Sequence, residues 1–182
     1  MSDSFRVEKT ETVLHSHVFD VERRFIRHGA ATFIREIALH CGAVAILAIN
    51  HDEEIGLLRQ YRAPFDRFTL EIPAGTLDVT GEAPLLAAQR ELVEELGCRA
   101  SSWTLLGRFM NSPGWTNQVM TIYEARNLTM TARRPDGPEE RSSRVQWFSK
   151  EALREVLRDE PAIDSTMAVA LHRVYGTFFD GI

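Results

Sequence analysis

The sequence predicts an α+β fold in which a mixed β-sheet lies between helices. Short apolar or alternating segments bounded by turn residues occupy most of the first 150 residues, as expected for strands. Helical patterns are confined to one segment in the middle of the chain and two at its end, 82–96, 150–159 and 163–178. Strands that come first and helices that come late are typical of the α+β class rather than of regular βαβ repeats.

The predicted strands fall into two groups. Segments 17–28 and 31–40 form an N-terminal hairpin around Gly29, and its phenylalanines could pack within the chain or against another copy. The run 42–49 is wholly apolar, which indicates a buried strand, and it pairs with 55–61. We therefore divide the chain into an N-terminal β-strand region, 1–40, and a main domain, 41–182. Further strands are expected at 68–72, 103–108, 119–125 and 145–148.

Length and composition limit the class of protein. A chain of 182 residues with 44% hydrophobic residues can bury a substantial core. Its longest apolar run is far shorter than the ~20 residues that cross a bilayer, and the N-terminus lacks the pattern of a signal peptide, so we expect a cytoplasmic protein without a membrane partner. A net charge of −5 argues against nonspecific nucleic-acid binding. Cys41 and Cys98 are predicted to be reduced core thiols.

The most informative segment is 82–96, a predicted helix that carries four glutamates. Side chains three and four residues apart share a helix face, so Glu91 meets both Glu94 and Glu95. Such like-charged neighbours destabilise a helix by a few tenths of a kcal/mol per pair, which divalent cations would relieve. Pro84 suits the first turn and Gly97 suits a left-handed cap. A solvated helix face with Arg–Glu pairs is the alternative interpretation.

This segment resembles the Nudix box. That pattern runs Gly, five residues, Glu, seven residues, then Arg-Glu-apolar-any-Glu-Glu-any-Gly-apolar. From Glu82 to Cys98 every fixed position matches, whereas six residues instead of five separate Gly75 from Glu82. The additional residue lies in the loop before the helix, so the spacing of the glutamates is unchanged.

The resemblance implies the α/β/α sandwich of Nudix hydrolases and a Mg²⁺ cofactor, for which Mn²⁺ could substitute. It assigns Glu91 and Glu95 as principal metal ligands with catalytic importance, Glu94 as a further ligand, and the Ala74 carbonyl as a backbone ligand. Carboxylate oxygens are the hard ligands that Mg²⁺ prefers. Glu82 and Arg90 would then be an orienting pair, and an ordinary surface salt bridge is an equally open interpretation.

A general base is expected outside the helix if metal ions occupy its glutamates. In similar ADP-ribose pyrophosphatases the base is a glutamate on a late loop, and the corresponding segment here is 138–141. Counting back from Trp147 favours Glu140 over Glu139. A solvated acidic loop without a catalytic role remains the alternative.

Substrate recognition is predicted from two further places. The segment 111–116 resembles the Ser-Pro-Gly-aromatic loop of ADP-ribose pyrophosphatases, with Pro113 and Gly114 at its centre, although a plain Pro-Gly turn would look the same. Such loops commonly continue to a glutamate, where this chain has Gln118.

Arg35 with its neighbour Glu36, and Arg62 in the segment Gln-Tyr-Arg, resemble residues that hold phosphate and adenine in the same family. Arginine suits both tasks because it forks onto phosphate oxygens and stacks on a flat base. Ordinary charges at a strand edge would be the structural alternative.

Taken together, the resemblance implies Mg²⁺-dependent hydrolysis of ADP-ribose to AMP and ribose 5-phosphate. Another nucleoside diphosphate derivative, such as a nucleotide sugar, a dinucleotide or FAD, is the nearer alternative. A catalytically silent nucleotide sensor is the more distant one, and it predicts loss of a metal-ligand carboxylate that this chain retains. The resemblance also implies a homodimer formed by exchange of the N-terminal hairpin, with the nucleotide between subunits.

Overall fold

The computed structural model describes residues 4–180, and the chain divides into two compact units. The amino-terminal unit comprises residues 1–42 together with 109–119. The main unit comprises residues 43–108 and 120–182. Each unit has its own sheet.

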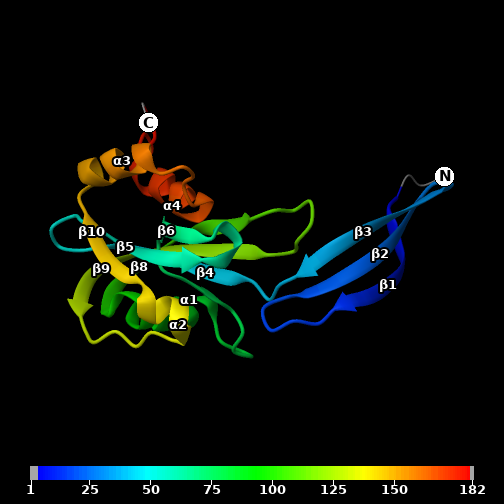
Figure 1. Cartoon of the computed structure of the whole chain (residues 1–182), viewed down its shortest axis with the longest axis horizontal. Helices are drawn as coiled ribbons and strands as arrows, with labels where there is room; N and C mark the ends of the chain where they lie inside the picture. Colours follow the sequence, from blue (N-terminus) through cyan, green and yellow to red (C-terminus); the bar gives the residue numbers. More distant parts are fainter. Residues whose placement is uncertain (1–3, 181–182) are drawn as a thin grey trace. The chain divides into compact units, whose positions relative to one another are not determined.

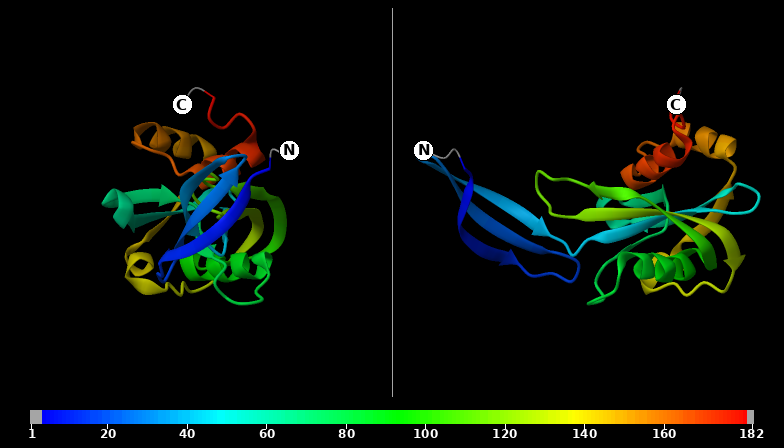
Figure 2. Two further views of the ribbon diagram at one scale, coloured as in Figure 1. Left: turned by 90° about the vertical axis from the view of Figure 1, so that its right-hand side faces the viewer. Right: turned by 180° about the vertical axis from the view of Figure 1, so that it is seen from behind.

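The amino-terminal unit is built on three antiparallel strands, β1 (Arg6–Leu14), β2 (Asp20–His28) and β3 (Ala31–Leu39), in the order β1-β2-β3. Gly29 makes the turn between β2 and β3 with a φ of 58°, a conformation that glycine adopts freely. The sequence predicted the β2–β3 hairpin but missed β1, whose alternation of charged and threonine residues offers few apolar positions. Figure 2 shows the three strands side by side as one twisted sheet.

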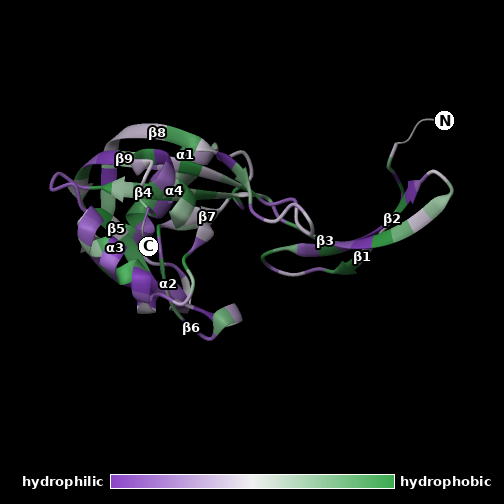
Figure 3. Cartoon of the chain, turned by 90° about the horizontal axis from the view of Figure 1, so that it is seen from above, coloured by the Kyte–Doolittle hydropathy of each residue, from purple (hydrophilic) through white to green (hydrophobic). Residues whose placement is uncertain are grey.

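This three-stranded sheet leaves large apolar side chains in solvent. No helix lies among the described residues of the amino-terminal unit, so neither face of the sheet is covered from within it. Figure 3 shows hydrophobic stretches alternating with hydrophilic ones along these strands. The exposed large apolar residues of β1–β3 and their connections are Phe5, Val7, Val13, Leu14, Val18, Phe19 and Ile34.

The main unit contains a seven-stranded mixed sheet. Its central path is β10-β5-β4-β9-β8, with β6 paired to β5 and β7 paired to β4. Strands β4 and β9 run parallel, whereas β4–β5, β4–β7, β5–β6 and β5–β10 are antiparallel. The strand bounds are β4 Ala43–Ile49, β5 Ile55–Arg62, β6 Arg67–Glu71, β7 Ala74–Thr76, β8 Cys98–Met110, β9 Val119–Met130 and β10 Arg144–Phe148.

Helices cover both faces of this sheet, which confirms the predicted α+β sandwich. Helix α1 (Pro84–Glu91) and the π-helical turn η2 (Leu92–Leu96) lie on one face, and α3 (Lys150–Asp159) with α4 (Ser165–Tyr175) lie on the other (Figures 1 and 2). A short 3₁₀ turn, η1 (Ala63–Phe65), links β5 to β6. The short helix α2 (Gly137–Ser142) was expected to be a loop. No helix within residues 4–180 is long and apolar enough to cross a membrane.

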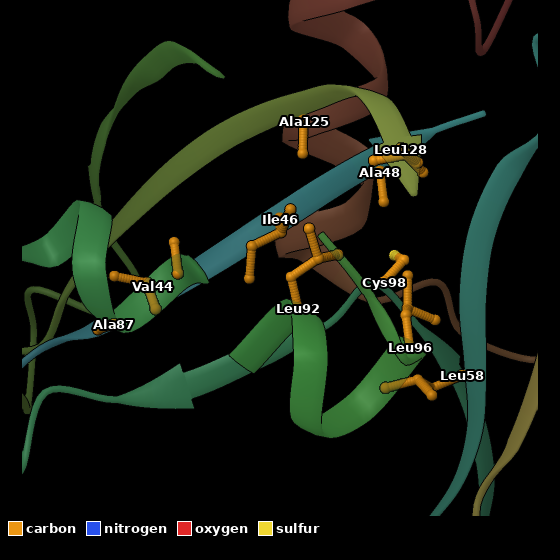
Figure 4. Packing of buried hydrophobic residues seen from close by; sticks show 11 residues of the cluster. Val44, Ile46, Ala48, Leu58, Ala87, Leu92, Leu96, Cys98, Ala125 and Leu128 are labelled. Carbon is orange, nitrogen blue, oxygen red and sulfur yellow. The ribbon is translucent and has the colours of Figure 1, made fainter. Parts of the chain in front are cut away.

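The core that supports α1 is formed by alternate residues of β4. Val44, Ile46 and Ala48 are fully buried and pack with Leu92 and Leu96 (Figure 4). Because β4 is central and buried on both faces, its sequence is continuously apolar, as predicted.

The two cysteines differ in environment. Cys98 is buried within this core, as expected, and burial raises the pKa of its thiol to about 11. Cys41 is exposed, so the prediction that it is a core thiol was wrong. It follows the last residue of β3 by two positions, outside either packed sheet.

Candidate active site

Helix α1 is placed by its apolar face and by the residues at its ends. It begins at Pro84, whose missing N–H needs no partner in the first turn. Ala87 and Ala88 are fully buried, and their small side chains let the helix lie close to the sheet. The last turn, η2, is π-helical, a rare form that is frequent at functional sites. This turn carries Glu94 and Glu95.

Gly97 ends the helix for two independent reasons. Its φ of 66° is left-handed, and its N–H donates to the Val93 carbonyl at 3.1 Å. A Cβ at this position would lie only 2.8 Å from Cγ of Arg133 and 2.9 Å from the Thr131 carbonyl oxygen. A side chain there would therefore strain the backbone and push away the segment that crosses the helix end.

Gly75 leaves the space that the Glu91 side chain occupies. It lies in β7, which pairs with β4, and a Cβ on it would overlap the Glu91 side chain. The additional residue in the loop between Gly75 and Glu82 does not alter this approach. The glycine of the motif therefore has a steric role here, against the first glutamate of the cluster.

Arg90 links three of the four glutamates. Its Nη1 donates to Glu91 at 2.7 Å and to Glu94 at 3.0 Å, and its Nη2 donates to Glu82 at 3.1 Å. The predicted contact between Glu82 and Arg90 is therefore present in the structure. Because the guanidinium bridges several carboxylates, it offsets their mutual repulsion along the helix.

Glu91 and Glu95 are buried carboxylates. They are 6% and 3% exposed, and Glu95 accepts a hydrogen bond of 2.8 Å from the Ala74 N–H. Burial raises the pKa of Glu91 to about 7, against the lowering effect of Arg90. Burial likewise raises the pKa of Glu95 well above its ordinary value, and the charges of Glu91 and Glu140 add to that rise. Both groups would ionise more easily beside a cation.

The donor set fits a hard divalent cation. Two buried carboxylates that resist ionisation, together with the half-buried Glu94, provide oxygen ligands of the kind Mg²⁺ prefers. Within residues 4–180, no three acidic, histidine or cysteine side chains already converge as a finished metal cage. Since Arg90 holds Glu91 and Glu94, their carboxylates would have to turn from Arg90 to share an ion with Glu95.

The two candidate bases lie on α2 with different neighbours. The charge of Glu140 contributes to the raised pKa values of Glu91 and Glu95, so it acts on the glutamate cluster. The charge of Glu139 acts instead on Arg62 and Tyr61. In this structure the Glu140 side chain accepts a hydrogen bond of 2.7 Å from the Asp136 N–H. Glu140 is thus held in place by its own helix.

Arg62 is paired with Glu71, a residue for which the sequence predicted no role. Its guanidinium forms a bidentate pair with Glu71, with Nη2–Oε2 at 2.6 Å and Nε–Oε1 at 2.9 Å. The pKa of Arg62 is raised, chiefly by this hydrogen bonding. Glu71 is the last residue of β6 and follows the buried Leu70, so a carboxylate at the end of an apolar strand was the available signal.

A separate pocket of about 320 Å³ lies within the amino-terminal unit. Arg24 and Arg35 face each other across β2 and β3, and both line the pocket. Residues 113–117 form its other side, including the predicted Pro113 and Gly114 and the exposed Trp115. The Arg35 guanidinium lies 4.7 Å from the Phe33 ring centroid. The structure thus brings Arg35 and the Pro-Gly loop together.

Glu36 and Gln118 are engaged elsewhere in this unit. Glu36 is exposed and pairs with Nε of Arg23 at 2.9 Å, and it is not among the pocket residues. Gln118 contacts Nε2 of His40 at 3.3 Å and Nδ2 of Asn111 at 2.8 Å. Burial lowers the pKa of His40, so a neutral ring and an amide replace the charged contact that a glutamate would make.

Comparison with known proteins identifies relatives across most of the chain. The family model described as the NUDIX domain matches residues 39–169. An ADP-ribose pyrophosphatase from Mycobacterium tuberculosis is 37% identical over 168 residues, which cover 91% of this chain and 80% of the relative. An ADP-ribose pyrophosphatase from Bacillus subtilis is 33% identical over 159 residues, or 87% and 83% of the two chains.

A solved structure agrees in fold. The crystal structure of an ADP compounds hydrolase superposes with a TM-score of 0.79 at 26% identity, covering 93% of this chain and 91% of the other. The coverage includes nearly all of both chains.

Proposed function

The chain belongs to the Nudix hydrolase family, and we propose that it hydrolyses the diphosphate linkage of ADP-ribose to AMP and ribose 5-phosphate with Mg²⁺ as cofactor. This proposal rests on two buried glutamates with raised pKa values, Glu91 and Glu95. They lie on a helix that also presents Glu94. Burying an ionised carboxylate costs free energy that a bound cation would offset. ADP-ribose is supported as the substrate by the names of two relatives at 37% and 33% identity.

Bound Mg²⁺ would supply Lewis-acid stabilisation of the diphosphate oxygens and would lower the pKa of the attacking water. We propose Glu91, Glu94, Glu95 and the Ala74 carbonyl as its ligands. The Ala74 N–H orients the Glu95 carboxylate, and Arg90 orients those of Glu91 and Glu94.

We propose Glu140 as the general base and Glu139 as the residue to test against it. Glu140 is the better candidate because its charge contributes to the raised pKa values of both Glu91 and Glu95. Its carboxylate would take a proton from the water whose oxygen bonds to phosphorus, while the bridging P–O bond breaks and the second phosphate leaves. To do so it would release the Asp136 N–H.

Arg62, Arg35, Pro113 and Gly114 are proposed to bind substrate. Arg62 is already charged and aligned by Glu71, and its outer edge could donate to a phosphate oxygen. Arg35 lines a pocket with Trp115, where a flat base could stack. Glu36 was also a candidate, and its pairing with Arg23 makes it a residue that orients β2 and β3 in this proposal.

We also propose that the protein is a homodimer formed through the amino-terminal unit. Its single-layer sheet exposes seven large apolar side chains, among them Phe5 at 67% and Val7 at 49%, which a second copy could cover. Sedimentation of a variant that begins at Arg35 tests this. The proposal predicts a monomer, and a dimer that persists without these strands would refute it.

The experiment that tests the activity is a substrate panel. ADP-ribose, other nucleotide sugars, a dinucleotide and FAD are incubated with the protein in Mg²⁺, Mn²⁺ or EDTA, and a phosphatase releases phosphate from the monoester products. The proposal predicts metal-dependent release that is strongest with ADP-ribose. Preference for another diphosphate would refute the assigned substrate, and no release from any compound would refute the enzyme.

A further inference from the structure

Helix α2, which carries Glu139 and Glu140, is held at its C-terminal end by one arginine. Arg133 donates from Nη2 to the Ser143 hydroxyl at 2.7 Å and to the Glu140 carbonyl at 3.3 Å. Its Nη1 donates to the Ser143 carbonyl at 3.3 Å. No carboxylate within residues 4–180 pairs with Arg133, and all the hydrogen bonds of its Nη1 and Nη2 go to α2 and the residue that follows it, while its buried Nε has no partner.

Ser143 completes this anchor. It is 7% exposed, and its hydroxyl and N–H both donate to the Glu140 carbonyl, at 2.7 and 3.1 Å. The backbone of Glu140 is therefore fixed by three donors from two residues. At its other side, the Glu140 carboxylate accepts from the Asp136 N–H. Carbonyls at a helix end lack partners within the helix, and here side chains and the following backbone N–H supply them.

The other end of Arg133 is tied to the glutamate helix. The backbone N–H of Thr131 donates to the Gly97 carbonyl at 2.7 Å and the backbone N–H of Arg134 donates to the Glu94 carbonyl at 3.2 Å, which fixes the backbone on both sides of Arg133. Gly97 leaves room for the Arg133 stem, since a Cβ there would lie 2.8 Å from its Cγ. Arg133 thus bridges the end of the metal-ligand helix and the backbone of the candidate base.

We propose that Arg133, with Ser143, is a positioning residue that sets Glu140 relative to the glutamate cluster on α1 and η2. A guanidinium suits this task because its fork reaches two carbonyls and a hydroxyl at once, which a lysine ammonium cannot do in the same plane. The inference rests on the proposed hydrolase function and on Glu140 as its base. It adds a residue outside the Nudix box to the catalytic geometry.

The test is a double-mutant cycle on ADP-ribose hydrolysis with saturating Mg²⁺. Arg133→Met keeps the stem beside Gly97 and removes the donors, and we expect kcat to fall about 10- to 100-fold because small misplacements of a catalytic group cost that much. KM and the Mg²⁺ half-saturation should change less than about twofold. In a Glu140→Gln background, Arg133→Met should lower kcat no further, since both changes disable the same group.

Arg144→Met is the matched control. It removes the guanidinium next to Ser143, whose side chain is exposed and makes no hydrogen bond or ion pair in residues 4–180, and it should retain wild-type kcat. Ser143→Ala serves as the second variant if Arg133→Met does not fold, with the same loss and the same non-additivity expected. Additive losses, or a kcat within twofold of wild type, would overturn the inference.

Hydrogen exchange separates this inference from the proposed function. Arg133→Met should speed amide exchange at residues 139–143 and leave residues 84–91 unchanged, a result that needs no turnover. Unchanged exchange in α2 would overturn the anchor even if the enzyme is active. A wild-type protein inactive on every diphosphate would refute the proposed function instead. Normal turnover in Glu140→Gln would overturn the inference together with the assignment of Glu140 as the base, but not the hydrolase activity, because Arg133 would then have no base to position.

Discussion

Replacing Glu91 with glutamine should stabilise the metal-free protein while removing its activity. Glu91 is 6% exposed, and burial raises its pKa to about 7 from an ordinary value of 4.5. Below pH 4.5 the Glu91 carboxyl is protonated in both the folded and the unfolded protein, so it imposes no charge on the folded interior and the fold is at its most stable with respect to this group. This stability is lost as the pH rises through about 7, because the folded protein must then hold a buried charge.

The size of the effect follows from this difference. At about 1.4 kcal/mol per pKa unit, the ionised carboxylate destabilises the metal-free fold by about 3 kcal/mol above pH 7. Glutamine has the same shape and never ionises, so Glu91→Gln should recover most of that free energy at pH 8 and little at pH 5. For a chain of 182 residues this corresponds to a melting temperature roughly 6–12 °C higher at pH 8.

The assay is thermal unfolding in EDTA from pH 5 to pH 8, repeated with Mg²⁺. The wild-type protein should lose stability as the pH rises in EDTA and regain it with Mg²⁺, whereas the variant should lose less, since it keeps the pH dependence of Glu95 but not that of Glu91. Equal melting temperatures at pH 8 in EDTA, or a variant less stable than wild type, would refute the argument that Glu91 is destabilising without a cation.

Three other predictions follow from the site. Glu95→Gln should lower turnover by orders of magnitude with the fold intact by circular dichroism, and near-normal turnover would remove it as a shared metal ligand. Glu140→Gln should lower kcat with little change in Mg²⁺ affinity, and a loss seen only in Glu139→Gln would move the base by one residue. Gly97→Ala should destabilise the fold by about 1–3 kcal/mol in urea titrations, because φ is 66° and its Cβ would meet Arg133; an unchanged midpoint would contradict both causes.

The parts of the fold that sequence predicted best are those with local signals. The apolar run of β4 and the spacing of the glutamates on α1 and η2 are readable because each depends on residues within a few positions. The two ends of this helical segment were also predictable, because Pro84 favours a first helical turn and Gly97 a left-handed cap through their own backbone angles. Strand β1 was missed because its partner residues in β2, not its own pattern, make it a strand.

Contacts between distant residues explain what the sequence did not reveal about the site. Glu71 holds Arg62 from nine positions along the chain, across the β5–β6 pairing. Arg133 reaches Ser143 over ten positions from an irregular segment. Helix α2 was not predicted because Gly137 and Pro138 mark a turn as readily as a first helical turn, and only the structure shows which one forms.

The most direct test of the central claim is ³¹P NMR of ADP-ribose incubated with the protein. With Mg²⁺ the diphosphate resonances should be replaced by two monophosphate resonances in equal amounts, those of AMP and ribose 5-phosphate, and EDTA or Glu95→Gln should prevent this. Persistence of the diphosphate signals with Mg²⁺, or the same products in EDTA, would contradict metal-dependent hydrolysis by the glutamate cluster.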